Sequence, residues 1–306
     1  MKLFTYETWG VPSTGLFDPS KKFVTSSFVS PLVLACIRAV LCLYCFTTII
    51  ISYSWLASNT ATVNLRDVNI GSYMIQQNEA AIGQSFSFFT YLTFWSLGFY
   101  FLLSSVHTFM FAFKERTWLH SWPKVLQLMH SFYYSCTTSM PFLVTIVFWG
   151  TMNSGWPAGR FEQWINLSVH GLNSVFAIVE ILLPATDAPP LGHLSVVLLV
   201  LSAYLGLAYM TRYTQGFYVY EWMNPVHGNA SIILHVLGYA LGMIIIFFLV
   251  SSAIRLREML AKWLSEGKGP SIQEKVMTLD GASDTWSGDA NMRRPQSARR
   301  KNESIV

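Results

Sequence analysis

The stretch WINLSVHGLNSVFAIVEILL, residues 164–183, is long and apolar enough to span a membrane as a helix. It nevertheless carries four polar side chains: Asn166, His170, Asn173 and Glu180. On a regular α-helix, at about 100° per residue, all four fall within an arc of about 80°. Lipid would leave their hydrogen-bonding groups without partners, so this polar stripe is predicted to face other helices or a water-filled cavity.

The composition points the same way as this stretch. The 306 residues are 52% hydrophobic and only 12% charged, with a mean hydropathy of +0.39. A soluble protein carries about twice that charged share, so the chain is predicted to be a multi-pass membrane protein. We expect an all-α fold, a six-transmembrane-helix bundle, with spans near residues 31–56, 86–113, 126–150, 163–183, 194–213 and 231–254.

The segments outside the spans give the expected domain organisation and orientation. Residues 1–30 form an N-terminal segment, residues 31–256 the transmembrane domain, and residues 257–306 a C-terminal tail. The tail is rich in Ser, Gly and charge from about Gly267 onward, so we expect it to be largely disordered. Lys and Arg concentrate in the N-terminal segment, before the third span and directly after the sixth, which places both termini in the cytoplasm. The membrane is that of the endomembrane system or the plasma membrane.

The charge and the remaining chemistry-bearing residues exclude several classes of function. The net charge of +4 is explained by a basic tail beside the membrane, so no nucleic-acid partner is implied. The four cysteines lie within apolar stretches and read as small buried hydrophobes. No H-x-x-x-H or H-E-x-x-H motif occurs, and no cofactor is expected. His107, His130 and His193 are either interfacial histidines or, together, ligands of a metal or haem.

The second expected span supplies a hydroxyl that could work with the polar stripe. Thr93 comes about seven residues into that span, and His170 comes about as far into the fourth, so at about 1.5 Å per residue both lie roughly 10–12 Å deep. A hydroxyl beside a neutral imidazole is the minimum needed for nucleophilic acyl transfer. Asn166 or Asn173 could orient His170 or donate to an oxyanion. Alternatively, the stripe holds helices together through hydrogen bonds that contribute about 1 kcal/mol or less each.

Three motifs in order, YLTFW, NLSVHGLNSVFAIVEILL and YTQGFYVYEWMNP, resemble those of the six-pass rolling stone proteins. More distantly, the chain is similar to the androgen-induced-protein family over about residues 30–250. That family includes threonine hydrolases of fatty acid esters of hydroxy fatty acids. Its catalytic threonine stands in a leucine-threonine-phenylalanine pattern, matched here at Thr93, and its histidine ends a W-x-N-x-x-x-H run, matched here at His170.

The resemblance therefore implies a lipid-ester hydrolase that acts on membrane lipids, with Thr93 as nucleophile and His170 as general base. The chain departs from the androgen-induced pattern at Leu167, where that family often has a second histidine, and at Arg212-Tyr213, which replace another histidine. The HGLNS sequence is closer to rolling stone, whose family role is myoblast fusion. The alternative is accordingly a non-catalytic multi-pass membrane protein of rolling stone type, with a role in cell fusion or as a scaffold.

Overall fold

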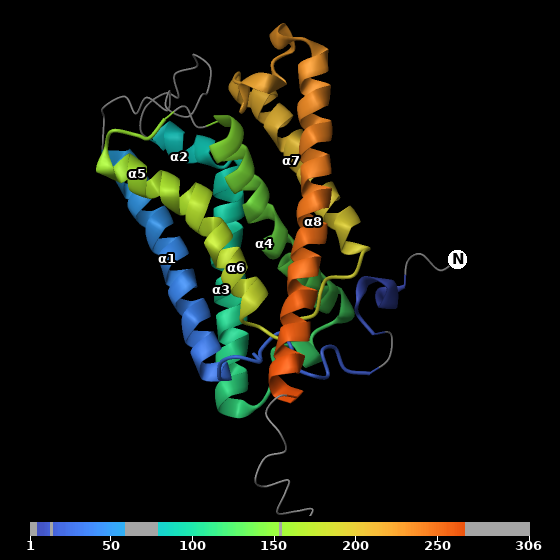
Figure 1. Cartoon of the computed structure of the whole chain (residues 1–306). Coiled ribbons are helices and arrows are strands. Elements are labelled where there is room, and N and C mark those ends of the chain that lie inside the picture. Colours follow the sequence, from blue (N-terminus) through green and yellow to red (C-terminus); the bar gives the residue numbers. More distant parts are fainter. Residues whose placement is uncertain (1–4, 13–14, 59–78, 153–154, 267–306) are drawn as a thin grey trace, which may run out of the picture. The chain divides into compact units, whose positions relative to one another are not determined.

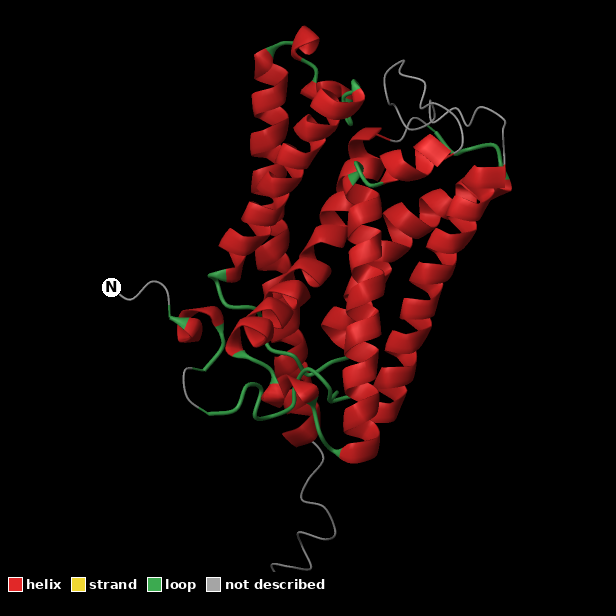
Figure 2. Ribbon diagram, turned by 180° about the vertical axis from the view of Figure 1, so that it is seen from behind, coloured by secondary structure: helices red, strands yellow, loops and turns green. Residues whose placement is uncertain are grey.

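The computed structural model describes residues 5–12, 15–58, 79–152 and 155–266. The described residues up to Met259 form one compact unit, and residues 260–266 belong to a second. The described residues are helical apart from turns and loops, and they contain no strand beyond one isolated bridge between Ser26 and Pro184 (Figure 2). The expected all-α fold is confirmed.

The helices are connected by short 3-10 turns and, at two places, continued by π turns. The α-helices are α1 (Pro31–Ser58), α2 (Glu79–Ser85), α3 (Phe89–Lys114), α4 (Lys124–Val147), α5 (Arg160–Leu167), α6 (Asn173–Leu182), α7 (His193–Gln215) and α8 (Asn229–Glu266). The 3-10 turns are η1 (Tyr6–Trp9), η3 (Trp118–Ser121), η6 (Glu221–Met223) and η7 (Pro225–His227). The π turns are η4 (Phe148–Met152), which continues α4, and η5 (Ser168–Leu172), which joins α5 to α6.

Five helical segments in the described part of the chain are long and apolar enough to cross a membrane: α1, α3, the α5–η5–α6 segment (Arg160–Leu182), α7 and α8. The expected third span corresponds to α4, which is not among the five. Its buried face is unusually polar, with Ser131, Ser135, Thr137, Thr138 and Ser139. The chain is therefore a multi-pass membrane protein, and the structure does not establish a sixth span.

Helix α4 turns one face to the bundle and leaves Val125, Leu126, Met129 and Ile146 exposed on the other. It packs against α3, α6 and α7, while α1 and α3 lie side by side along their lengths (Figure 1). The core between these helices is built largely of aromatic and aliphatic side chains, among them Phe94, Leu97, Phe101, Leu143 and Phe176. Polar side chains of α4 face protein rather than lipid, which explains how a helix of modest hydropathy sits at this position.

Several boundaries differ from those expected. Helix α8 continues to Glu266, so residues 257–266, which we assigned to the tail, are helical. The tail expected to be disordered, residues 267–306, lies outside the described residues, as do residues 59–78 of the loop between the first two spans. The end of that loop forms the short helix α2.

Candidate functional site

The two π turns meet at His170. The imidazole ring of His170, on η5, stacks on the ring of Phe148, on η4, with centroids 3.5 Å apart and planes 7° from parallel. The Nε1 atom of Trp149 donates a hydrogen bond to the backbone carbonyl oxygen of His170 at 3.1 Å. A π turn inserts a residue into a helix and redirects its side chains, and such turns occur often at functional sites. The regular helix assumed for residues 164–183 is therefore wrong at its centre.

The tautomer of His170 is fixed by a neighbouring backbone group. Its Nδ1 atom lies 3.2 Å from the carbonyl oxygen of Asn166. A carbonyl oxygen can only accept, so Nδ1 carries the hydrogen and Nε2 keeps its lone pair. Among the described residues Nε2 has no hydrogen-bond partner, and the side chain is 7% exposed. His170 thus has the form that a general base requires.

Thr93 lines a cavity of about 400 Å³ between α3, α4 and α7. The side chain is buried, and its Oγ1 atom donates to the carbonyl oxygen of Thr90 at 2.9 Å. The walls of this Thr93 cavity are mostly apolar and are formed by Phe89, Leu92, Thr93, Ser96, Leu97, Tyr133, Cys136, Thr137, Met140, Pro141, Val200, Ala203, Tyr204 and Leu207. A hydroxyl at such a place is shielded from bulk water.

A second cavity of about 290 Å³ adjoins the first. We call it the Phe148 cavity; Thr90 and Phe148 contribute to its walls, together with residues of α7, η6 and α8. Phe89 and Tyr204 line both cavities, and their rings lie 4.8 Å apart. These two side chains form the partition between the cavities. The hydroxyl of Tyr204 accepts a hydrogen bond from the backbone N–H of Phe89, which fixes the partition at the start of α3.

No hydrogen bond joins Thr93 to His170 in the described part of the chain, and His170 lines neither cavity. A shared contact gives their rough separation along the helices. The rings of Phe101 and Phe176 are 6.4 Å apart and align α3 with α6. Thr93 precedes Phe101 by about 12 Å and His170 precedes Phe176 by about 9 Å, at about 1.5 Å per residue. Phe148, which stacks on His170, stands between the imidazole and the Phe148 cavity.

The two asparagines take different positions. The side chain of Asn173 is fully buried between α6 and α4, where Oδ1 accepts from Thr145 Oγ1 at 3.0 Å and from the backbone N–H of Ser174 at 2.7 Å. Its Nδ2 atom is buried and has no hydrogen-bond partner in the described part of the chain. Asn166 is half-buried and contacts His170 through its backbone carbonyl. Of the two, Asn166 is the residue that the structure brings to the imidazole.

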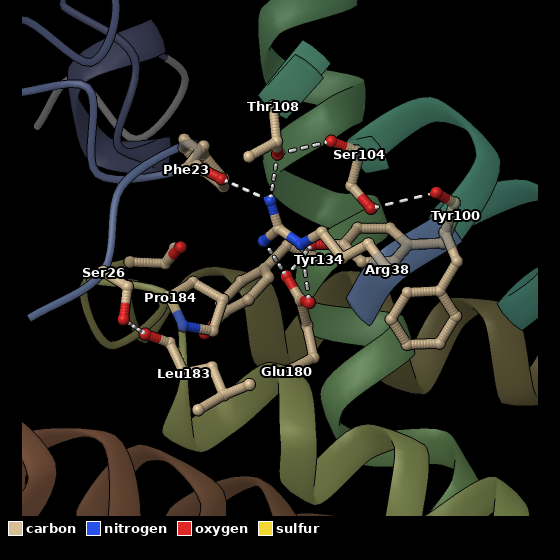
Figure 3. Close-up of polar contacts among 12 residues, drawn as sticks. Phe23, Ser26, Arg38, Tyr100, Ser104, Thr108, Tyr134, Glu180, Leu183 and Pro184 are labelled. Atoms are coloured by element: carbon tan, nitrogen blue, oxygen red, sulfur yellow. Dashed lines mark hydrogen bonds and ion pairs between the residues drawn. The ribbon is translucent and has the colours of Figure 1, made fainter. Parts of the chain in front are cut away.

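The polar stripe ends at a buried ion pair that the sequence reading missed. Arg38, on α1, donates from Nε to Glu180 Oε2 at 3.0 Å and from Nη2 to Oε1 (Figure 3). Tyr100 donates to Oε1 at 2.7 Å, and Arg38 Nη1 donates to Thr108 at 2.7 Å. Arg38 and Glu180 are each 1% exposed, so both charges of the pair are removed from water and from lipid. The sequence did contain a signal for this pair: Arg38 lies inside the first expected span, and a charged side chain within a membrane span is usually paired with a group of opposite charge.

The three histidines considered as ligands are not gathered into one site. His193 is engaged by the Ser135 hydroxyl at 2.7 Å and the Trp9 carbonyl oxygen at 3.0 Å. His107 and His130 are buried with ring centroids 5.7 Å apart, and within the described ranges neither ring nitrogen of His107 has a hydrogen-bond partner. No group of three or more metal-binding side chains occurs among the described residues.

The polar stripe faces protein, as predicted, because the side chains of His170, Asn173 and Glu180 are all buried.

Comparison with known proteins places these features in a family. The model of the FAR-17a/AIG1-like protein family matches residues 40–257, which include Thr93, Asn166, His170, Asn173 and Glu180. Because that match covers most of the chain, the protein belongs to the FAR-17a/AIG1-like family, as the resemblance to androgen-induced proteins predicted. No curated protein and no solved structure matches it.

Proposed function

We propose that this member of the FAR-17a/AIG1-like family hydrolyses lipid esters within the membrane, with Thr93 as the nucleophile and His170 as the general base. The observation that carries the proposal is the position of Thr93. Its side chain borders a mostly apolar cavity of about 400 Å³ that is lined by three helices and open on one side. Ligand pockets are typically concave, mostly apolar, and about 300–1,000 Å³, with a few placed polar groups.

The reaction needs a proton acceptor for the Thr93 hydroxyl. Thr93 Oγ1 attacks the ester carbonyl carbon while its proton passes to His170 Nε2, and the alcohol leaves with that proton. His170 then deprotonates a water molecule that attacks the acyl-threonine ester, and it returns that proton to Thr93 Oγ1 as the acid is released. In the structure the hydroxyl donates to Thr90 instead, so it must rotate, and Phe148 must move for the imidazole to approach. Catalytic hydrogen bonds often form only in the substrate complex.

The two cavities support a substrate with two apolar arms. They share the walls Phe89 and Tyr204, next to Thr93 on one side and Thr90 on the other. An ester that joins two acyl chains would place its carbonyl near this partition and one arm in each cavity. Fatty acid esters of hydroxy fatty acids, the substrates implied by the family resemblance, have this shape.

The proposal includes six spans and cytoplasmic termini. Helix α4 would be the additional span, and its packing against α3, α6 and α7 accounts for its Ser and Thr content. An even number of spans places both termini on one side. The excess of Lys and Arg near the ends of the chain favours the cytoplasmic side, in the endomembrane system or the plasma membrane.

Substitution of the proposed pair tests the activity. Purified full-length protein, reconstituted in lipid, would be assayed on a panel of branched fatty esters. We expect Thr93→Ala and His170→Ala each to lower the rate by several orders of magnitude, and the double variant to be no slower, because members of one catalytic unit are not additive. Ser105→Ala, which removes a buried hydroxyl of α3 that lines neither cavity, is the matched control. Activity that survives Thr93→Ala, or its absence from the wild type on every ester, would refute the proposal.

A second candidate, a non-catalytic scaffold or cell-fusion protein, rests on the contacts of α6 with α4. Asn173 bonds to Thr145, and the Ser174 hydroxyl donates to the Pro141 carbonyl oxygen at 3.0 Å. Such hydrogen bonds hold membrane helices together. On this reading Thr93→Ala and His170→Ala change only stability, and by similar small amounts.

A further inference from the structure

Thr137 is a buried hydroxyl without a partner on the wall of the Thr93 cavity. Its side chain, on α4, is 3% exposed, and Oγ1 has no hydrogen bond among the described residues. Ser and Thr within helices ordinarily donate to a carbonyl oxygen of the preceding turn. The neighbouring Thr138 does so, to Tyr134 at 2.9 Å, and Thr93 does so on the opposite wall. Thr137 therefore has an unpaired donor beside the cavity; its Oγ1 atom is itself buried, so the side chain must rotate about χ1 to present the hydroxyl to a ligand there.

The helix around Thr137 also lacks one backbone hydrogen-bond donor. Pro141, one turn later, lines the same cavity and has no N–H, so it cannot donate to the Thr137 carbonyl oxygen as an ordinary residue would. Thr137 thus has a free hydroxyl and a carbonyl without its usual helical donor. Since burying an unpaired polar group costs free energy, a ligand that supplies a partner at this point would be stabilised.

We infer that the Thr137 hydroxyl binds the carbonyl oxygen of a single long acyl chain held in the Thr93 cavity. The apolar side chains of Leu92, Met140 and Leu207 line the space that would receive the hydrocarbon. The hydroxyl supplies the hydrogen bond that fixes the carbonyl between α3 and α4. A fatty acid and the acyl part of an ester share this chemistry.

Resting on the proposed function, the same contact gives Thr137 a role in hydrolysis. When Thr93 Oγ1 attacks, the π electrons of the carbonyl group move onto its oxygen, and Thr137 donates a hydrogen bond to that oxyanion without transferring its proton. Loss of one such donor typically lowers kcat by about 100- to 1,000-fold. KM is expected to change much less, because the bond strengthens as the charge develops.

Two measurements on the full-length protein in lipid nanodiscs test the inference. A long-chain fatty acid with a diazirine and an alkyne would be photo-crosslinked over a range of concentrations, and the labelled peptides mapped. We expect saturable labelling of α3, α4 and α7 in the wild type. Thr137→Val should raise the half-saturating concentration about tenfold, whereas Thr137→Ser should stay near the wild type. Thr138→Val, which removes the adjacent hydroxyl, is the control.

The outcomes separate this inference from the proposed function. Labelling that depends on Thr137, with no ester hydrolysed, supports the binding site and overturns the hydrolase. Hydrolysis with kcat unaffected by Thr137→Val, and unchanged labelling, overturns the role of Thr137 and leaves the hydrolase intact. Should Thr137→Val not fold, Ala203→Leu fills the same cavity from α7 and should abolish saturable labelling. Labelling unchanged by Ala203→Leu places the acyl chain elsewhere and refutes the inference.

Discussion

Arg38 of α1 and Glu180 of α6 form a doubly hydrogen-bonded ion pair, each side chain 1% exposed. Its remaining polar atoms are also satisfied: Glu180 accepts from Tyr100 of α3, and Arg38 donates to Thr108 of α3 and to the Phe23 carbonyl oxygen. Two charges removed from water are stable only when they are paired this completely. The pair therefore fixes α1, α3 and α6 relative to one another, below the π turn that carries His170.

Removing one partner of this pair should be far more damaging than removing both. Glu180→Ala leaves the Arg38 charge buried and unpaired, which typically costs about 3–5 kcal/mol. Replacing both residues, as Arg38→Met with Glu180→Leu, should recover much of that loss because no charge stays buried. Thermal unfolding of the detergent-purified variants would measure this. The exposed pair Lys22–Asp187 is the control, and Lys22→Ala should change the free energy of unfolding by about 1 kcal/mol or less. Equal losses in single and double variants would contradict the account.

The sequence predicted the helices better than it predicted their contacts. Apolar runs located the spans because a membrane demands about 20 such residues, and the stripe showed which face of the fourth span is buried. The π turn at His170 was hidden, since the local change of helical period has no mark in the residue types. The equal depth of Thr93 and His170 stays a prediction, and the direction of each side chain depends on the packing of α4 and on Phe148, which the sequence does not reveal. Thr137 was missed because Ser and Thr are common along α4.

The tautomer of His170 gives a spectroscopic prediction. Because the Asn166 carbonyl oxygen can only accept from Nδ1, the neutral ring should carry its hydrogen on Nδ1 rather than on Nε2. Nitrogen-15 NMR of histidine-labelled protein would distinguish the two nitrogens by their chemical shifts, with His170→Gln used to assign the signal. A ring protonated on Nε2 would leave no lone pair at the position where the proposed mechanism needs it.

The contact of Asn173 with Thr145 distinguishes packing from catalysis. Asn173→Ala removes hydrogen bonds between α6 and α4, so we expect it to lower the free energy of unfolding by about 1 kcal/mol. A double-mutant cycle with Thr145→Val should show a coupling of about 0.6 kcal/mol, the usual size inside membranes. Because Asn173 does not contact His170 directly in the described hydrogen-bond network, ester hydrolysis by Asn173→Ala should stay within a few-fold of the wild type. A loss as large as that of Thr93→Ala would place Asn173 in the reaction.

Whether α4 crosses the membrane can be decided at its two ends. Ser121, before α4, and Ala158, before α5, are both exposed, so a cysteine at either position can react with a maleimide. The native cysteines Cys36, Cys42, Cys45 and Cys136 are free and would first be replaced by serine. With a membrane-impermeant maleimide admitted to the cytosol alone, we expect Ser121→Cys to be labelled and Ala158→Cys to be protected, since the Lys and Arg near Ser121 favour the cytoplasmic side. Tags at the two termini should both be reached from the cytosol in the same preparation. Labelling of both cysteines from one side would mean that α4 does not span, and the two termini would then lie on opposite faces.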